Sequence, residues 1–100
     1  MKSSGYLINT ARGGLVNEQA LEKALNQGWI AGAALDCFES EPPDVSQRLF
    51  QTANTVFSPH TAGLTGECMR RLGITAVQNV IEALDGTLCP ERVVNKQVLK

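Results

Sequence analysis

One apolar run, residues 30–35 (Ile-Ala-Gly-Ala-Ala-Leu), constrains the fold more than any other part of the sequence. A strand with one face in water alternates apolar and polar residues, whereas this run is apolar at every position. Such a run is typical of a central strand in a parallel sheet that helices cover on both faces. Its small side chains would also let those helices approach closely. The run therefore predicts an α/β protein in which this strand ends at the charged Asp36.

The segments on either side of this run alternate between strand-like and helix-like patterns. Apolar residues at helical spacing between Asn17, a helix-capping residue, and Gly28, a helix-stopping one, predict a helix. A second apolar stripe, from Met69 to Leu84, predicts a longer helix that begins near Thr65 and lies in the core. The expected strands are 6–8, 30–35 and 55–57, and the expected helices are about 18–27 and 65–86.

The connection between the second and third expected strands, residues 37–54, has no regular pattern. Pro42 and Pro43 exclude a helix at its start, and a helical turn is expected near Leu49. The whole order is therefore strand, helix, strand, connection, strand and long helix. This alternation predicts a parallel sheet of three short strands, with right-handed crossovers that place helices on its faces, as in a doubly wound α/β domain.

Four polar residues follow these strands at their carboxyl ends. Arg12 comes after the first strand, Asp36 and Glu41 after the second, and His60 after the third. We expect them to lie together, because the carboxyl ends of parallel strands form the edge where open α/β sheets bind ligands. An arginine can hold and polarise a 2-oxoacid, and a histidine beside a carboxylate can move a proton. The set suits reduction of a carbonyl group by a nicotinamide.

Each of these residues also has a purely structural interpretation. Arg12 could be a helix-capping or surface arginine, Asp36 could merely end a strand, and a lone histidine is usually a surface or core residue. Glu41 has a second carboxylate, Glu39, two positions away, and either could be a solvated loop charge. Gly13 and Gly14 are expected to serve backbone geometry instead of phosphate binding, since no helix is expected directly after them.

Composition narrows the class of protein. One hundred residues with 43% hydrophobic content can bury one modest core but not two domains. The formal net charge of −1, without a long run of like charges, gives no indication of binding to nucleic acid or an anionic membrane. No apolar run approaches membrane-spanning length. The sequence also lacks the glycine-rich fingerprint G-x-G-x-x-G that seats a dinucleotide pyrophosphate.

The three cysteines, Cys37, Cys68 and Cys89, are an odd number, and none is spaced as a C-x-x-C pair. Neither a disulfide framework nor a metal site is therefore indicated. A reducing cytoplasm is the expected location. For Cys37, packing as a small apolar residue is favoured over a redox function.

Three ordered blocks of the sequence resemble a known family. They are LINTARGGLV from Leu7, GAALDCF from Gly32 with a Glu-Pro pair at Glu41, and SPHTAG from Ser58. Between about residues 1 and 95, the chain resembles the C-terminal part of the D-isomer-specific 2-hydroxyacid dehydrogenases, with glycerate and phosphoglycerate dehydrogenases among the relatives. The resemblance implies a Rossmann-type NAD(P)-binding domain. It also favours Glu41 over Glu39, because a proline follows Glu41 as in the family motif.

The resemblance implies roles for individual residues. Arg12 would bind the carboxylate and carbonyl of a small 2-oxoacid, His60 would be the acid and base, and Glu41 would hydrogen-bond His60. Asp36 would contact the nicotinamide end of NAD or NADP. The residues expected to line this cofactor are Thr10, Ala11, Arg12, Asp36, His60, Thr61, Ala62 and Gly63.

The resemblance also implies a domain organisation. Residues 1–86 would be the C-terminal part of the NAD(P)-binding domain, and residues 87–100 a tail that returns to a substrate domain. We expect a fragment, because the family's nucleotide fingerprint would precede Met1, which fits an internal position of the pattern. The isolated chain is then expected to be inactive and to self-associate through an open strand edge. The alternative function is a non-catalytic NAD(H)-sensing or partner-binding relative.

Overall fold

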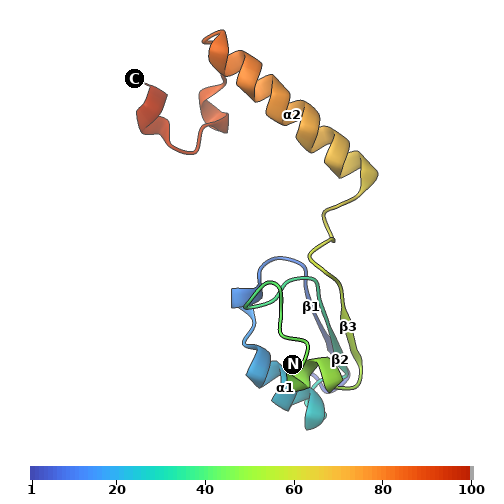
Figure 1. The fold of residues 1–100 in the computed structure, drawn as a ribbon. Coiled ribbons are helices and arrows are strands. Elements are labelled where there is room, and N and C mark those ends of the chain that lie inside the picture. Colours follow the sequence, from blue (N-terminus) through green and yellow to red (C-terminus); the bar gives the residue numbers. More distant parts are fainter. Residues whose placement is uncertain (100) are drawn as a thin grey trace. The chain divides into compact units, whose positions relative to one another are not determined.

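The computed structural model describes residues 1–99 of the chain, which divides into two compact units. The first unit is Met1–Gly63 and the second begins at Leu64. Figure 1 shows the elements in chain order, with the sheet and α1 in the first unit and α2 in the second. All residues expected to carry chemistry therefore fall within the first unit.

The first unit is built on a three-stranded parallel sheet. Its strands are β1 (Tyr6–Asn9), β2 (Gly32–Leu35) and β3 (Thr55–Phe57), in the order β1-β2-β3. The expected parallel sheet is confirmed, and the apolar run at residues 30–35 does supply its central strand. Ile8 pairs with Ala34, and Ala34 pairs with Val56, so these residues form one row across the sheet.

One α-helix and two short 3-10 helices accompany the sheet. They are α1 (Glu18–Asn26), η1 (Gly13–Leu15) and η2 (Arg48–Gln51). The Asn17 side chain caps α1 by accepting a hydrogen bond of 2.8 Å from the Ala20 N–H, as the sequence predicts. Gly28 follows the helix at φ 66°, a conformation that favours glycine. Gly13 and Gly14 lie within the short 3-10 turn η1, and α1 begins only at Glu18, so no α-helix follows the two glycines directly.

The core lies against one face of the sheet. Apolar side chains of the strands pack there against α1 and η2, and the connection between β2 and β3 closes over them. The buried cluster consists of Leu21, Ile30, Ala33, Leu35, Phe38 and Leu49, with Leu7 and Phe57 partly buried against it. Because α1 and η2 pack on this face, the strand ends from which the site loops begin are held in place.

The opposite face of the sheet carries exposed apolar side chains. Ile8 is 71% exposed, Val56 is 67% exposed and Tyr6 is 69% exposed. Within the first unit, the one α-helix between the strands, α1, packs on the core face. The expectation that helices cover the central strand on both faces stays a prediction for the opposite face.

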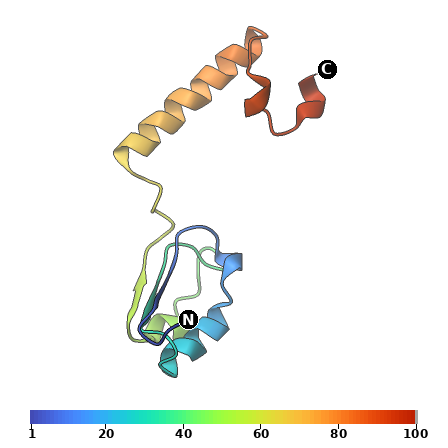
Figure 2. The ribbon, with the colours of Figure 1, turned by 180° about the vertical axis from the view of Figure 1, so that it is seen from behind.

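The second unit contains the long helix α2 (Gly66–Leu84) and a tail with the 3-10 helices η3 (Pro90–Arg92) and η4 (Lys96–Leu99). The Thr65 side chain caps α2 by accepting from the Cys68 N–H at 3.1 Å, so its predicted start is confirmed. Arg92 pairs with Glu82 at 2.9 Å and ties the tail to the helix. Figure 2 shows this unit from behind.

The prediction that the Met69 to Leu84 stripe lies in the core stays a prediction, and the second unit by itself does not cover the stripe. No residue of α2 is buried, and Leu84 is 83% exposed. Two 3-10 helices of three and four residues offer too little apolar surface to bury a helix of 19 residues. The predicted division after Gly86 concerns a longer enzyme and stays a prediction. Within the described residues, no helix is long and apolar enough to cross a bilayer.

Candidate active site

His60 and Glu41 form a hydrogen-bonded pair beyond the carboxyl ends of β2 and β3. The His60 Nδ1 lies 2.8 Å from Glu41 Oε2. The other carboxylate oxygen, Oε1, accepts a hydrogen bond of 3.1 Å from the Phe38 N–H. These contacts lower the pKa of Glu41 below its ordinary value, with the hydrogen bond to His60 as the largest cause, so Glu41 is ionised near neutral pH. Both side chains remain partly open to solvent, with 47% of His60 and 39% of Glu41 exposed.

The backbone at His60 has the left-handed conformation, with φ at 55°. This conformation is uncommon outside glycine and persists only where surrounding contacts enforce it. Asp36 supplies these contacts. Its carboxylate accepts from the Ser58 hydroxyl at 2.6 Å, from the Thr61 N–H at 2.8 Å and from the Ala62 N–H at 2.9 Å.

Asp36 therefore holds the chain on both sides of His60. Asp36 is 3% exposed, and its hydrogen bonds, with Ser58 first, lower the pKa of its carboxyl group. Both of its oxygens are already engaged by residues of the β3 loop. The expected contact between Asp36 and a nicotinamide is not tested by this geometry and stays a prediction.

Arg12 lies in the loop that follows β1, at the same edge of the sheet. Its guanidinium donates to the carbonyl of Ala11 at 2.6 Å, and its side chain is exposed. Asn9, the last residue of β1, shapes this loop by donating to the Arg12 carbonyl at 2.8 Å and accepting from the Ala11 N–H at 3.1 Å. The positive charge of Arg12 is near enough to contribute to the lowered pKa of Glu41. The structure therefore places Arg12 near the His60–Glu41 pair, although its guanidinium is hydrogen-bonded to Ala11 and not to either of these two side chains.

Gly13 explains how closely the Arg12 loop approaches the Glu41 loop. A Cβ atom at Gly13 would lie 1.8 Å from the Phe38 carbonyl oxygen, so no residue with a side chain fits there without movement. A Cβ atom at Gly14 would meet nothing within 4 Å. Of the two glycines, only Gly13 is therefore required by the close approach of the backbone, as the sequence predicts for both.

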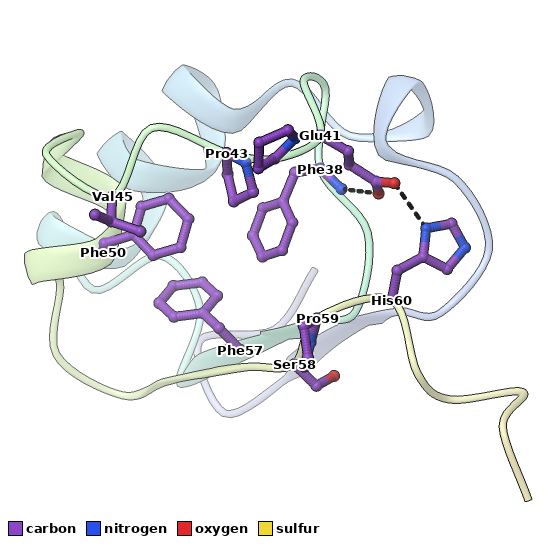
Figure 3. A pocket seen from close by; sticks show the side chains of 10 residues that line it. Phe38, Glu41, Pro43, Val45, Phe50, Phe57, Ser58, Pro59 and His60 are labelled. Atoms are coloured by element: carbon purple, nitrogen blue, oxygen red, sulfur yellow. Dashed lines mark hydrogen bonds and ion pairs between the residues drawn. The ribbon is translucent and has the colours of Figure 1, made fainter.

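An apolar cavity of about 480 Å³ adjoins the pair. Its walls are formed by three phenylalanines together with prolines of the two loops. The main lining residues are Phe38, Pro43, Val45, Phe50, Phe57 and Pro59. In Figure 3 the His60 ring lies at one end, with Nδ1 toward Glu41 and its other nitrogen directed away from the phenylalanines. The second ring nitrogen, Nε2, thus points away from this cavity.

The residues expected to line a dinucleotide lie around the same edge. Thr10, Ala11 and Arg12 are exposed after β1, and His60, Thr61, Ala62 and Gly63 are exposed after β3. A Cβ atom at Gly63 would meet nothing within 4 Å, so open space adjoins the backbone there. These residues could reach a nicotinamide, but the N–H groups of Thr61 and Ala62 are already bound to Asp36.

Cys37, directly after Asp36, is 2% exposed, and its thiol lies 3.7 Å from the Asn9 carbonyl oxygen. Burial raises the pKa of this thiol, so it stays protonated and packs as a small apolar residue. No group of three or more metal-binding side chains occurs in residues 1–99.

Sequence reasoning missed two residues that organise the site. Glu18 and Glu39 accept hydrogen bonds from each other's backbone N–H groups, at 3.1 and 2.7 Å. The sequence pattern marks Glu39 only as an alternative to Glu41 and assigns no role in the site to Glu18. The sequence gives no signal for this pairing, because the two positions are 21 residues apart. Ser58, which donates to Asp36, is marked in the sequence only as the first residue of the SPHTAG block.

The fold and the geometry define a class of protein: an α/β domain with a hydrogen-bonded histidine–glutamate pair at the carboxyl edge of its parallel sheet. Residues 1–62 match the model of the D-isomer specific 2-hydroxyacid dehydrogenase NAD binding domain. The chain belongs to this family, and the resemblance seen in its three sequence blocks is confirmed.

Individual relatives agree with this assignment. The chain is 50% identical over 100 residues to a glyoxylate reductase of Thermofilum pendens, covering 100% of this chain and 29% of the relative. The NAD-complexed D-isomer specific 2-hydroxyacid dehydrogenase of Lactobacillus delbrueckii matches with a TM-score of 0.81 at 34% identity, over 94% of this chain and 32% of that one. An acyclic imino acid reductase in complex with NADPH and D-Arg matches with a TM-score of 0.77 at 31% identity, over 88% and 28%. The chain thus spans about a third or less of these relatives.

Proposed function

We propose that this chain supplies the acid–base pair and the substrate-gripping arginine of an NAD(P)-dependent oxidoreductase that interconverts a small 2-oxoacid and its D-2-hydroxyacid. The observation that carries the proposal is the 2.8 Å contact between His60 and Glu41 at the carboxyl edge of the sheet. A matched relative is a glyoxylate reductase, which fits a short 2-oxoacid. The chain alone is proposed to be inactive, because it contains no pyrophosphate-binding fingerprint.

His60 moves the proton in this mechanism. With Nδ1 directed to Glu41, the ring presents Nε2 on the side away from the apolar cavity. His60 would donate the Nε2 proton to the oxygen that gains negative charge, while a bound reduced nicotinamide would be the source of the hydride for the carbonyl carbon. In the oxidation direction the neutral ring takes the hydroxyl proton back. Glu41 fixes the orientation of the ring through its contact with Nδ1.

Arg12 binds the substrate anion. Its planar guanidinium matches the geometry of a carboxylate and can donate two hydrogen bonds to it. Its present partner is a backbone carbonyl, that of Ala11, and the side chain is exposed, so the group can turn to a 2-oxoacid without breaking an ion pair. A guanidinium can contact both the carboxylate and the carbonyl oxygen, which fixes the carbonyl for reduction.

The cofactor is proposed to be NAD or NADP, lying along the same edge. The exposed residues after β1 and β3, Thr10 to Arg12 and His60 to Gly63, would line its nicotinamide end, with Asp36 fixing the second of these segments. The matched solved structures contain NAD in one case and NADPH in the other, which leaves both open.

Three further expectations belong to the same proposal. The exposed edge strand β1 and the open sheet face favour a homo-oligomer. The three free cysteines favour a cytoplasmic location. Residues 1–86 would complete a cofactor domain, with residues 87–100 returning to a substrate domain. The alternative of a non-catalytic NAD(H) sensor gains no support, because the matched proteins are reductases and a dehydrogenase.

A chimaera tests the proposal. This chain replaces the corresponding 100 residues of the Thermofilum pendens reductase, and oxidation of NADH or NADPH is followed by absorbance with a panel of 2-oxoacids. Turnover of glyoxylate or hydroxypyruvate is expected, and Arg12→Lys should raise KM strongly, because a point charge cannot replace the two-point grip. Cofactor binding without turnover of any 2-oxoacid would support the sensor instead.

A further inference from the structure

The turn that carries Glu41 has little regular structure of its own. Residues 37–43 form neither helix nor strand, and Glu41 is 39% exposed at its side chain. Such a turn would let a carboxylate move by more than the length of a hydrogen bond unless other contacts hold it. The Glu41 carboxylate nevertheless bridges two donors, the Phe38 N–H and the His60 ring. Contacts from residues other than Glu41 must therefore hold the turn in place.

Two carboxylates connect this turn to the start of α1. The Glu18 carboxylate accepts from the Glu39 N–H at 2.7 Å, and the Glu39 carboxylate accepts from the Glu18 N–H at 3.1 Å. The Glu18 N–H belongs to the first turn of a helix and has no partner inside that helix, so Glu39 satisfies it. The positive end of the helix dipole also favours both negative charges there.

This reciprocal pair does more than cap a helix. Asn17 already supplies the ordinary cap through Ala20. Glu18 is only 8% exposed, whereas an acidic residue serving the dipole alone would lie in solvent. The Glu39 N–H it binds is adjacent in sequence to the Phe38 N–H that binds Glu41. The carbonyl of Phe38 lies close to Gly13, so the peptide unit between Phe38 and Glu39 contacts both the Arg12 loop and the start of α1.

We propose that Glu18 and Glu39 are positioning residues, which clamp the turn to α1 and thereby hold the Glu41 carboxylate against His60. This inference rests on the proposed function only in what Glu41 does for His60. The claim that Glu18 and Glu39 set the position of Glu41 can be tested without measuring enzyme activity.

The test is an NMR titration of the Glu41 side-chain carboxyl carbon in the full chain. In Glu39→Ala the Glu41 pKa should rise by at least about half a unit, because the carboxylate loses its fixed donors. Loss of the negative charge at position 39 alone would lower the Glu41 pKa, so the sign of the change separates lost positioning from lost charge.

Matched variants complete the design. Glu39→Gln removes the charge but keeps an oxygen acceptor, so the Glu41 pKa should stay low. Glu39→Asp keeps the charge but shortens the reach, so the pKa should rise, and this milder change serves if the alanine variant does not fold. Glu22→Ala, on the same helix with Asn26 as its partner, should change nothing.

The proposal is overturned if the Glu41 pKa is unchanged or falls in the folded alanine and aspartate variants, or if it rises equally in the glutamine variant. The chimaera can remain active in either case, so failure of the clamp and failure of the proposed function give different results.

Discussion

Asp36 and Ser58 follow neighbouring strands, and the Ser58 hydroxyl donates to the Asp36 carboxylate at 2.6 Å. Together with the N–H groups of Thr61 and Ala62, this contact fixes the loop in which His60 adopts a positive φ. A single buried carboxylate thus determines the backbone on both sides of the proposed acid–base residue. The backbone strain at His60 is balanced by the three hydrogen bonds that Asp36 accepts.

Asp36 should make stability dependent on pH in acid. Because its folded pKa is lowered, its contribution is present above the ordinary value of 3.8 and is lost as the pH falls through the lower folded value. Asp36→Asn keeps one acceptor oxygen but puts an amide donor opposite an N–H, so its melting temperature should be lower at neutral pH. The difference in melting temperature between the variant and the wild type should become smaller as the pH falls toward 3. Thermal melts measure this, and melting curves separated by the same amount at every pH would contradict it.

Gly13 and Gly14 should respond differently to the same substitution. Gly13→Ala forces a Cβ atom into the Phe38 carbonyl, so we expect a loss of about 1–3 kcal/mol in the free energy of unfolding. Gly14→Ala has open space and should change it by less than about 0.5 kcal/mol. Urea unfolding of the two variants provides the comparison. Equal effects would show that the close approach of the two loops is not what Gly13 permits.

The open face of the sheet should drive self-association of the chain. Ile8 and Val56 lie in one row across the sheet, are 71% and 67% exposed, and belong to its two edge strands, β1 and β3. Sedimentation should show a dimer or larger species, and Ile8→Lys or Val56→Lys should weaken it. Gln27→Lys, which adds the same charge after α1, serves as the control. A wild-type monomer at high concentration would contradict this prediction.

The isolated chain should bind NAD weakly or not at all. It offers residues for the nicotinamide end, but no glycine-rich turn for the pyrophosphate, which supplies much of the affinity for a dinucleotide. Calorimetry with NAD checks this directly. A dissociation constant of about 1 µM, equivalent to about −8 kcal/mol, would show that the loops after β1 and β3 suffice.

The parts of the fold that the sequence predicted well depend on local patterns. The apolar run at residues 30–35 and the capping residues Asn17 and Thr65 identified the central strand and both helix starts, because these signals act within a few residues. Burial depends on distant contacts. The Met69 to Leu84 stripe shows which face of α2 is apolar, but the pattern does not show which surface covers that face.

The site shows the same difference between local and distant interactions. The positions of Arg12, Glu41 and His60 at one sheet edge follow from the parallel topology, which the alternation of elements predicts. The reciprocal pairing of Glu18 with Glu39 does not follow from any pattern, since it depends on how a turn folds back onto α1. The Asp36 carboxylate was likewise expected to face a cofactor, and its three bonds to the β3 loop could not be read from spacing.

The central claim is that His60 transfers the proton during reduction of a 2-oxoacid. Its most direct test is the turnover number of the chimaera with glyoxylate and the reduced cofactor, compared between the wild-type segment and His60→Ala. We predict a fall of about 10²- to 10⁴-fold in kcat, with the dissociation constant of the reduced cofactor changed by less than about threefold. A His60→Ala chimaera that turns over at the wild-type rate would contradict the claim.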